Sequence, residues 1–352
     1  MDIFREMNAK GHERLLFWND PDAGLNAIIA IHNTTLGPAL GGCRIWPYNN
    51  TQEAIKDVLR LSRAMTYKAS VCGINLGGGK SVIIGSQPKN REAVFRSFGR
   101  FVESLEGIYI TAEDVGTSVS DMEIVKLQTS HVAGVSKEKG GSGDPSIATA
   151  IGVYWGIKAC LKNTSGGESV AGKTVAIQGI GKVGFYLAEI LSKEGAKVFL
   201  TDIDRSRTED IIKRFGGDYI PPKDIFSVST DIFCPCALGG ILNDETIPLL
   251  KCRIVAGSAN NQLEDESHGR MLHERGILYA PDFVINAGGL INVANEIEGY
   301  DKDKALSQVK SIYDTLLNIF RISTVESIPT NMAADRMAED RIRRKKASTG
   351  GS

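Results

Sequence analysis

The sequence predicts an α/β protein of two domains, the second of which is built on a doubly wound parallel sheet. Three observations support this fold class. The chain has 352 residues, which is more than one hydrophobic core usually serves. Strand-like and helix-like segments alternate in two separate stretches, and a glycine-rich, charged segment between Val135 and Pro145 reads as a boundary or hinge between them.

The first stretch begins with the apolar run Asn26–Ile31, whose β-branched residues favour a strand. Apolar residues at helical spacing and further short apolar runs follow it. The elements that we expect after this strand are a helix at 51–68, a strand at 81–84, a helix at 91–105, a strand at 108–112 and a helix from about Ser118.

The second stretch opens with a helix at about 146–162 and then repeats a strand–helix pattern, which predicts a parallel, doubly wound sheet. The expected elements are strands at 173–178, 197–201, 231–234, 253–256 and 277–280, and helices at 182–193, 206–214, 244–250 and 265–275. Helical patterns continue over 288–299, 304–322 and 331–347. The basic end of the last helix, from Arg341 to Lys346, is interpreted as a solvated helix terminus.

Composition excludes several classes of partner. Charged residues make up 24% of the chain and the net charge is −1, which gives no general attraction to nucleic acid or to acidic membranes. No apolar run approaches the roughly 20 residues of a membrane span, and the first residues lack the apolar core of a signal peptide. We therefore expect a cytoplasmic protein that acts on a small molecule.

The six cysteines are scattered through the chain, which is typical of a reducing compartment, and we predict six free thiols. Cys234 and Cys236 have no second pair or histidine at ligand spacing. We interpret them as buried structural residues and expect no metal site.

The segment from Met65 to Lys80 places two lysines in apolar surroundings. Lys68 continues the apolar stripe of a predicted helix, and Lys80 follows three glycines whose backbone we expect a substrate to approach closely. Burial and a neighbouring ammonium both favour a neutral amine, and a neutral lysine can act as a general base. We predict that one of the two is catalytic; the alternative is two ordinary lysines whose amines extend to solvent.

A dinucleotide-binding motif follows the predicted strand at 173–178. Gly179, Gly181 and Gly184 have the spacing that allows a tight turn, close approach of a pyrophosphate and close helix packing, and Lys182 and Val183 open the helix. Asp202, 18 residues after Gly184, can accept the ribose hydroxyls of NAD. A nearby arginine is what NADP enzymes use, so Arg205 leaves NADP as an alternative cofactor. The structural alternative is a Rossmann-type turn that binds no ligand.

Several motifs together resemble the glutamate, leucine, phenylalanine and valine dehydrogenases over nearly the whole chain. The segments that carry the resemblance are 35–42, 65–68, 77–80, 111–117, 257–262 and 286–289. Within this group the resemblance is closest to the branch that acts on apolar amino acids, leucine dehydrogenases first. It implies a substrate-binding and oligomerisation domain at 1–135 with 331–352 packing back on it, an NAD-binding Rossmann domain at 145–330, and an active site in a cleft between them. It also implies a homo-oligomer, possibly an octamer.

The resemblance implies reversible, NAD-dependent oxidative deamination of an L-amino acid to its 2-oxo acid and ammonia. Lys68 would pair with the substrate carboxylate, Lys80 would be the general base that activates water, and Asp114 would assist proton transfer at nitrogen. Asn261 would also reach the substrate carboxylate. The residues implied at the nicotinamide end of the cofactor are Thr149, Asn260 and Asn286.

The side-chain pocket implied by the resemblance contains no charged residue. Its positions are Leu40, Gly41, Met65, Ala112, Leu290 and Val293. A distal carboxylate would lack a partner there, which argues against glutamate as the substrate. Ala112 resembles leucine dehydrogenases and Leu290 the phenylalanine enzymes, so we expect leucine and related branched chains, with phenylalanine or another aromatic amino acid as the alternative.

Two other classes of function remain. A catalytically silent, NAD-binding regulator has no need of Lys68, Lys80 and Asp114 together. A hydroxy-acid dehydrogenase would use a histidine beside a carboxylate, and none of the five histidines lies in a candidate catalytic motif.

Overall fold

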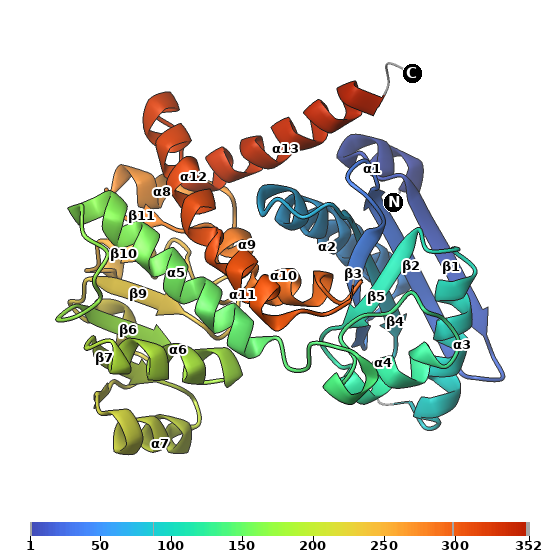
Figure 1. Cartoon of the computed structure of the whole chain (residues 1–352), viewed down its shortest axis with the longest axis horizontal. Helices are drawn as coiled ribbons and strands as arrows, with labels where there is room; N and C mark the ends of the chain where they lie inside the picture. The colour runs from blue at the N-terminus through green and yellow to red at the C-terminus, as the bar shows by residue number, and fades with distance from the viewer. Residues whose placement is uncertain (1, 87, 298, 350–352) are drawn as a thin grey trace. The chain divides into compact units, whose positions relative to one another are not determined.

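The computed structural model describes residues 2–86, 88–297 and 299–349 (Figure 1). The chain divides into two compact units, and both draw on distant parts of the sequence. The first unit comprises Met1–Asp144, Val293–Lys302 and Ala338–Ser352, and the second comprises Pro145–Asn292 and Asp303–Met337. Each unit has its own β-sheet, which confirms the predicted two-domain α/β fold.

The first unit contains a mixed five-stranded sheet with the order β1-β2-β4-β3-β5. β1 and β2 are antiparallel to their neighbours, whereas β3 runs parallel to β4 and β5. The strands are β1 (Arg14–Asp20), β2 (Leu25–Asn33), β3 (Ala39–Trp46), β4 (Gly77–Ile84) and β5 (Tyr109–Glu113). The helices are α1 (Ile3–Lys10), α2 (Thr51–Val71), α3 (Arg91–Glu103) and α4 (Val119–Lys126).

Strands β1 and β3 were not expected from the sequence. β1 is an edge strand with no buried residue, so its side chains carry little apolar periodicity. β3 contains Gly41 and Gly42, which normally weaken a strand. In the structure a Cβ on Gly41 would lie 1.7 Å from the carbonyl oxygen of Gly79, so glycine is required there for β3 to approach β4.

The three glycines before Lys80 lie inside β4, not in an open loop. A Cβ on Gly78 would lie 2.1 Å from the backbone nitrogen of Thr66 in α2, and one on Gly79 would lie 2.7 Å from the ring of Tyr109. Glycine is therefore required here, because a side chain at these positions would need occupied space. Neighbouring parts of the protein already fill that space.

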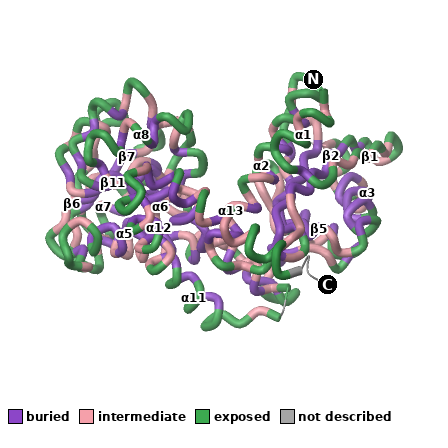
Figure 2. Tube along the Cα trace, turned by 90° about the horizontal axis from the view of Figure 1, so that it is seen from above, coloured by how far each residue is buried: buried purple, intermediate pink, exposed green. Residues whose placement is uncertain are grey.

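The two faces of this sheet are covered by different helices. α2 packs on one face through an apolar cluster that includes Val58, Leu59 and Val82. α3 and α4 pack on the other face, where Phe95, Phe98 and Met122 belong to a larger cluster. Buried residues consequently line the strands and the inner helix surfaces, whereas α1 buries none of its residues (Figure 2).

The second unit contains a parallel six-stranded sheet with the order β11-β10-β9-β6-β7-β8. Read from β8, this is the strand order 3-2-1-4-5-6 of a dinucleotide-binding Rossmann fold. The strands are β6 (Thr174–Gln178), β7 (Lys197–Thr201), β8 (Asp218–Tyr219), β9 (Ile232–Pro235), β10 (Ile254–Val255) and β11 (Leu278–Tyr279). The helices that begin in this unit are α5 (Ser146–Ser165), α6 (Lys182–Lys193), α7 (Arg205–Phe215), α8 (Ser267–Glu274), α9 (Asp282–Ile285), α10 (Gly288–Ala294), α12 (Ile312–Glu326) and α13 (Thr330–Thr349). α11 (Lys302–Lys310) begins at the last residue of a first-unit segment and continues in the second unit.

The helix predicted at 244–250 is wrong. Only Ile247–Leu249 is helical, as a single 3-10 turn. Pro248 has no backbone N–H to donate, and the side chain of Asn243 instead accepts from the backbone nitrogens of Glu245 and Thr246 at 3.1 and 3.0 Å. These local bonds hold a turn in place of a longer helix.

The basic end of α13 is only partly solvated, contrary to the interpretation from sequence. Arg341 is half-buried and donates to the carbonyl oxygens of Ser70, Gly73 and Ile74 at 3.1, 3.0 and 2.7 Å. A guanidinium suits these acceptors because the last carbonyls of a helix have no partner within it. Arg341 thus caps the carboxyl end of α2.

The six cysteines all carry free thiols, as predicted, and Cys234 is buried while Cys236 is partly buried. Among the described residues, no helix is long and apolar enough to cross a membrane.

Two buried histidines join β2 and the segment before β1 to α2. His32 hydrogen-bonds the hydroxyl of Thr66 at 2.8 Å and the carbonyl of Lys10 at 2.9 Å, and its ring lies 4.7 Å from that of His12. Burial lowers the pKa of His32 to about 4, and burial also lowers the pKa of His12. Both rings are therefore neutral at pH 7.

We predict that this pair makes the protein acid-sensitive. Because the pKa of His32 is lower in the folded chain than the ordinary 6.5, its contribution is complete above pH 6.5 and is lost as the pH falls toward 4. The loss amounts to about 3 kcal/mol at most. Chemical denaturation between pH 7 and 4 should show a shallower decline for His32→Gln than for wild type, while His273→Gln, which changes an exposed histidine, should follow wild type. Parallel curves for wild type and His32→Gln would contradict the assignment.

Candidate active site

The predicted catalytic and pocket residues of the first unit gather on one face of its sheet. Gly78, Lys80 and Val82 alternate along β4, and the register pairs Leu40 with Gly78 and with Ile110. Since alternate residues of a strand share a face, Leu40, Lys80 and Ala112 all point to the side that α2 covers. All three are almost fully buried.

Lys80 and Asp114 form an ion pair on this face. The Nζ of Lys80 lies 2.9 Å from Oδ2 of Asp114, although the Lys80 residue is only 5% exposed. Burial raises the pKa of the Asp114 carboxyl, but the charges of Lys80 and Arg44 outweigh that effect and hold the pKa below its usual value. Asp114 is therefore a carboxylate next to a buried amine.

The backbone around Asp114 is fixed by a short turn after β5. Its backbone nitrogen donates to Oγ1 of Thr117 at 2.8 Å, and that hydroxyl lies 2.9 Å from the carbonyl oxygen of Cys43 in β3. Thr117 thus ties the turn to the neighbouring strand and fixes the direction in which Asp114 points.

Arg44 is a charged member of this site that the sequence analysis missed. Its Nε donates to the same Oδ2 of Asp114 at 3.0 Å. The available signal was an arginine directly after the Gly41-Gly42-Cys43 segment, a basic residue in an otherwise apolar stretch.

Met65 and Lys68 lie in the last turns of α2. The backbone of α2 at Thr66 passes directly over Gly78, two residues before Lys80 in β4. Met65 and Lys68 are both half-buried and flank this crossing. The structure therefore places the predicted carboxylate-binding lysine on the helix that covers the face carrying Lys80.

Gly41 lies on the opposite face from Leu40 and Ala112. Its carbonyl oxygen accepts from the phenol of Tyr109 at 2.5 Å. Any contact of Gly41 with a substrate would therefore involve the backbone.

Val293 belongs to the first unit and Leu290 to the second, and both are half-buried in α10. Three residues beyond Val293, the carboxylate of Glu296 accepts from the backbone nitrogens of Gly134 and Ser142, both at 2.8 Å. A Cβ on Gly134 would lie 3.9 Å from that of Ala112. Glu296 thus anchors the segment that begins with Val293 close to the strand that carries Ala112.

The glycine motif of the second unit has the geometry of a phosphate-binding turn. Gly179 has a φ of +97°, and a Cβ on Gly184 would lie 2.0 Å from the carbonyl oxygen of Gly179. Gly181 instead faces open space, with nothing within 4 Å of a Cβ. It precedes the first turn of α6, where Lys182 and Val183 lie, and no side chain caps that helix end. These residues fit a pyrophosphate, because free backbone N–H groups at a helix N-terminus bind anions.

Asp202 lies at the end of β7, next to this turn. Its carboxylate accepts from the backbone nitrogens of Ile180 and Asp204 at 2.6 and 2.8 Å. Each oxygen retains a second lone pair, so the same carboxylate can also accept ribose hydroxyls.

Three predicted amide residues lie beyond the ends of β10 and β11. Asn286 donates through Nδ2 to the carbonyl of Ser258 at 3.0 Å and to Oδ1 of Asn260 at 2.7 Å. Asn261 adopts a positive φ of 51°, and its carbonyl accepts from Gly240 at 2.7 Å. Thr149 in α5 lies against α10, since a Cβ on Gly289 would be 2.7 Å from its hydroxyl.

Two exposed apolar residues at the same sheet edge were missed by the sequence analysis. Ile203 is 98% exposed and Leu238 is 78% exposed, and they follow β7 and β9 on either side of β6. At the carboxyl edge of a Rossmann sheet such side chains are available to cover a bound ligand. The available signal was their position directly after the ends of two parallel strands.

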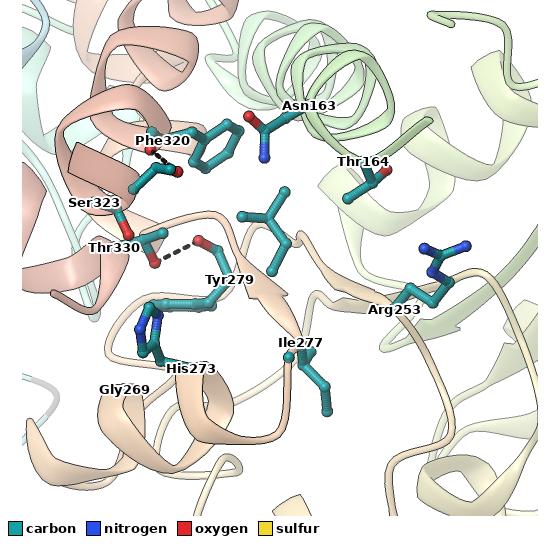
Figure 3. Close-up of a pocket in the computed structure, with 13 residues that line it drawn as sticks. Asn163, Thr164, Arg253, Gly269, His273, Ile277, Tyr279, Phe320, Ser323 and Thr330 are labelled. Atoms are coloured by element: carbon teal, nitrogen blue, oxygen red, sulfur yellow. Dashed lines mark hydrogen bonds between the residues drawn. The ribbon is translucent and has the colours of Figure 1, made fainter. Parts of the chain in front are cut away.

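A pocket of about 310 Å³ in the second unit is not this site (Figure 3). It lies at the amino ends of β10 and β11, and its lining includes Arg253, Ile277 and Tyr279 together with Phe320 and Ser323 of α12. Ligands of a Rossmann fold bind at the opposite, carboxyl ends of the strands. None of the predicted site residues lines this pocket.

The described residues of the two units therefore provide a buried lysine–aspartate pair beside an apolar surface and a dinucleotide-binding turn. A Rossmann sheet together with such an acid–base pair is typical of a dehydrogenase. Within the described residues, no group of three or more histidine, cysteine or carboxylate side chains is placed to hold a metal ion.

Comparison with known proteins identifies the family. The Glu/Leu/Phe/Val dehydrogenase dimerisation domain matches residues 12–131, and the Glutamate/Leucine/Phenylalanine/Valine dehydrogenase domain matches residues 140–204 and 200–346. The chain belongs to the Glu/Leu/Phe/Val dehydrogenase family and is an amino-acid dehydrogenase.

The similarity extends over nearly the full length of named relatives. The leucine dehydrogenase of Geobacillus stearothermophilus is 54% identical over 97% of this chain and 94% of its own, and the phenylalanine dehydrogenase of Lysinibacillus sphaericus is 50% identical over 97% and 91%. The crystal structure of L-tryptophan dehydrogenase from Nostoc punctiforme superposes with a TM-score of 0.88 at 47% identity, covering 98% of this chain and 99% of that one.

We predict that Gly181→Ala abolishes dinucleotide binding without unfolding the protein. The added methyl group would enter the open space in front of α6, where a pyrophosphate would lie, and would meet no protein atom. Thermal unfolding without ligand should match wild type, while the stabilisation by saturating NAD should fall to near zero, since it measures affinity for the folded state.

Two further variants complete this test. Gly184→Ala should lower the unfolding temperature without ligand, because its methyl group would overlap the carbonyl of Gly179. Gly167→Ala, at another open glycine, should behave as wild type. Undiminished stabilisation of Gly181→Ala by NAD would rule out the turn as the cofactor site.

Proposed function

We propose that this enzyme catalyses the reversible, NAD-dependent oxidative deamination of an apolar L-amino acid, leucine and related branched chains first, to its 2-oxo acid and ammonia. The observation that carries the proposal is the 2.9 Å ion pair between Lys80 and Asp114, buried beside the apolar side chains of Leu40 and Ala112. A reaction that moves protons on and off nitrogen and water needs such an acid–base pair.

Each group has a chemical task in this proposal. The ammonium of Lys68 binds the substrate carboxylate and orients the α-carbon. Bound NAD would supply the hydride acceptor. The amine of Lys80 takes a proton from the water that attacks the resulting iminium, and Asp114 stabilises the ammonium of the substrate and relays protons to and from its nitrogen. Asn261 adds a neutral hydrogen-bond donor for the carboxylate.

An apolar substrate fits the residues of the proposed pocket. Leu40 and Ala112 are 2% and 9% exposed, and Met65 and Val293 are half-buried, so a charged side chain would find no counter-ion among them. Burying it unpaired would cost several kcal/mol. Identities of 50–54% to leucine dehydrogenases favour a branched chain, while the 50% identity to a phenylalanine dehydrogenase makes an aromatic amino acid the second candidate.

The charges around Asp202 favour NAD over NADP. Residues 202–210 contain four carboxylates and two arginines, which would repel a 2′-phosphate. Arg205 pairs with Glu209 at 2.9 Å and stacks on Tyr219, so its guanidinium already has partners. In this proposal Ile203 and Leu238 would cover the adenine, and Thr149, Asn260 and Asn286 would hold the nicotinamide end.

The family to which the chain belongs contains a dimerisation domain, which matches residues 12–131. We propose that the enzyme is a homo-oligomer. Six free thiols support a reducing, cytoplasmic location.

We predict separate kinetic effects for the two lysines. Lys80→Met should lower kcat for leucine about 10²–10⁴-fold, because it removes the general base. Lys68→Met should raise KM for leucine about 10- to 100-fold, because it removes a charged hydrogen bond to the carboxylate. Lys56→Met, an exposed lysine on the same helix, should retain wild-type values. Near-normal kcat in Lys80→Met would exclude it as the base.

The preferred substrate is a separate prediction. The measurement is NADH formation at alkaline pH with leucine, isoleucine, valine, phenylalanine, tryptophan, glutamate and 2-hydroxyisocaproate. Branched-chain amino acids should be turned over fastest, with NAD preferred to NADP. Preference for phenylalanine or tryptophan would support the second candidate and indicate a wider pocket. Activity only on the hydroxy acid, or no activity, would refute the proposal and favour the hydroxy-acid enzyme or the silent regulator.

A further inference from the structure

Arg44 connects the catalytic pair to a second carboxylate. Through Nε it donates to Asp114, and through Nη1 it donates to Oδ2 of Asp57 in α2 at 3.0 Å. Asp57 also accepts from the phenol of Tyr48 at 2.7 Å and from Arg60 at 3.0 Å. The planar guanidinium therefore bridges two carboxylates, a geometry that a lysine cannot reproduce.

The strands place Arg44 where it must meet Asp114. The parallel register pairs Cys43 with Glu113 and Arg44 with Val82, so the next residue after β5 falls beside Arg44. Arg44 also shares its face of the sheet with Lys80, two residues before Val82. Both cations reach the same oxygen of Asp114, at 2.9 and 3.0 Å.

The charges in this network balance in only one protonation state of the lysine. Lys80, Arg44 and Arg60 are the cations, and Asp114 and Asp57 are the anions. The sum is +1 when the Lys80 amine carries its proton and zero when it does not. Guanidinium groups do not lose their protons in proteins, so the two arginines retain their charge throughout.

The other titratable groups near the pair do not alter this balance. Burial raises the pKa of Cys43 in β3 to about 12, and burial also raises the pKa of Tyr109 in β5 and of Tyr48, so all three stay neutral. Asp121 of α4 is paired with an arginine of α3, at 2.6 Å. Lys68 of α2, the helix that covers this face, is a further cation.

We propose that Arg44 is the positioning residue that releases Lys80 for proton transfer: by holding Asp114 as a carboxylate in a second, permanent ion pair, it lets the Lys80 amine give up its proton without leaving that carboxylate unpaired. The inference rests on the proposed function, in which Lys80 is the base. Without Arg44, the Lys80–Asp114 pair would lose this second, permanent cation, and the negative carboxylate would favour the protonated amine of Lys80 up to higher pH.

The test is the pH profile of kcat/KM for the preferred amino acid with NAD. Arg44→Met should move the acid limb of the profile upward by about one pH unit and lower kcat about 10- to 100-fold. KM for NAD should not change. Arg44→Lys should move the limb back toward wild type, since it restores the charge, while a purely structural role would not give this charge-dependent shift.

Arg60→Met is the matched control, because it removes a cation from the same network without touching Asp114. Its acid limb should move much less than that of Arg44→Met, because the exposed Arg60 contacts Asp57 and not Asp114. A limb of Arg44→Met that coincides with wild type, or an equal shift in Arg60→Met, would overturn the proposal.

If Arg44→Met fails to fold, Asp57→Asn provides a second test of the role of Arg44. With its amide oxygen in the place of Oδ2 it keeps an acceptor for Arg44 and Tyr48 and loses only the acceptor that faces Arg60. The charge of Arg44 is then left to Asp114 alone, so the acid limb should move to lower pH. An unmoved limb would overturn the role of Arg44. Absence of amino-acid oxidation by the wild-type enzyme would instead refute the proposed function, so the two failures are distinguishable.

Discussion

The close backbone packing at the start of β4 is the constraint on which the first unit depends. Gly77, Gly78 and Gly79 each meet a different neighbour, with hypothetical Cβ atoms 2.1 Å from the carbonyl of Asn33, 2.1 Å from the nitrogen of Thr66 and 2.7 Å from the ring of Tyr109. No other residue type allows these approaches. They bring α2 down onto the sheet and fix the strand that carries Lys80. The glycines therefore serve the face that carries Lys80 indirectly, through packing.

A buried amine is costly unless it is paired, and the network around Asp114 is how this fold accommodates one. The carboxylate lies between Lys80 and Arg44, and Arg44 is in turn held by Asp57 from the helix on the same face. Such buried pairs add little net stability. In the proposed reaction, their importance lies in deciding which group holds a proton.

In the second unit, the backbone itself forms the edge at which a dinucleotide would bind. In the sheet, β6 lies between β7 and β9. The chain continues from β6 to β7 on one side and from β9 to β10 on the other side of the β6–β9 pair. The resulting edge exposes the end of α6, the carboxylate of Asp202, and the apolar side chains of Ile203 and Leu238. Recognition of a dinucleotide then needs few side chains, because backbone N–H groups and a helix end already attract phosphate.

The sequence by itself determined the features that are local. The Gly179–Gly184 turn was predicted correctly, because strand, turn and helix are specified within one short segment, and so were the two-domain α/β class and the family. β1 and β3 were missed, and a helix was wrongly expected at 244–250, because one edge strand lacks periodicity, Gly41 and Gly42 mask a strand, and Pro248 limits a helix to one turn. Only the tertiary structure decided that Arg44 meets Asp114, that Arg341 caps α2, and that the glycines before Lys80 pack against protein. Each of these depends on segments tens to hundreds of residues apart, whose contacts leave no pattern in the local sequence.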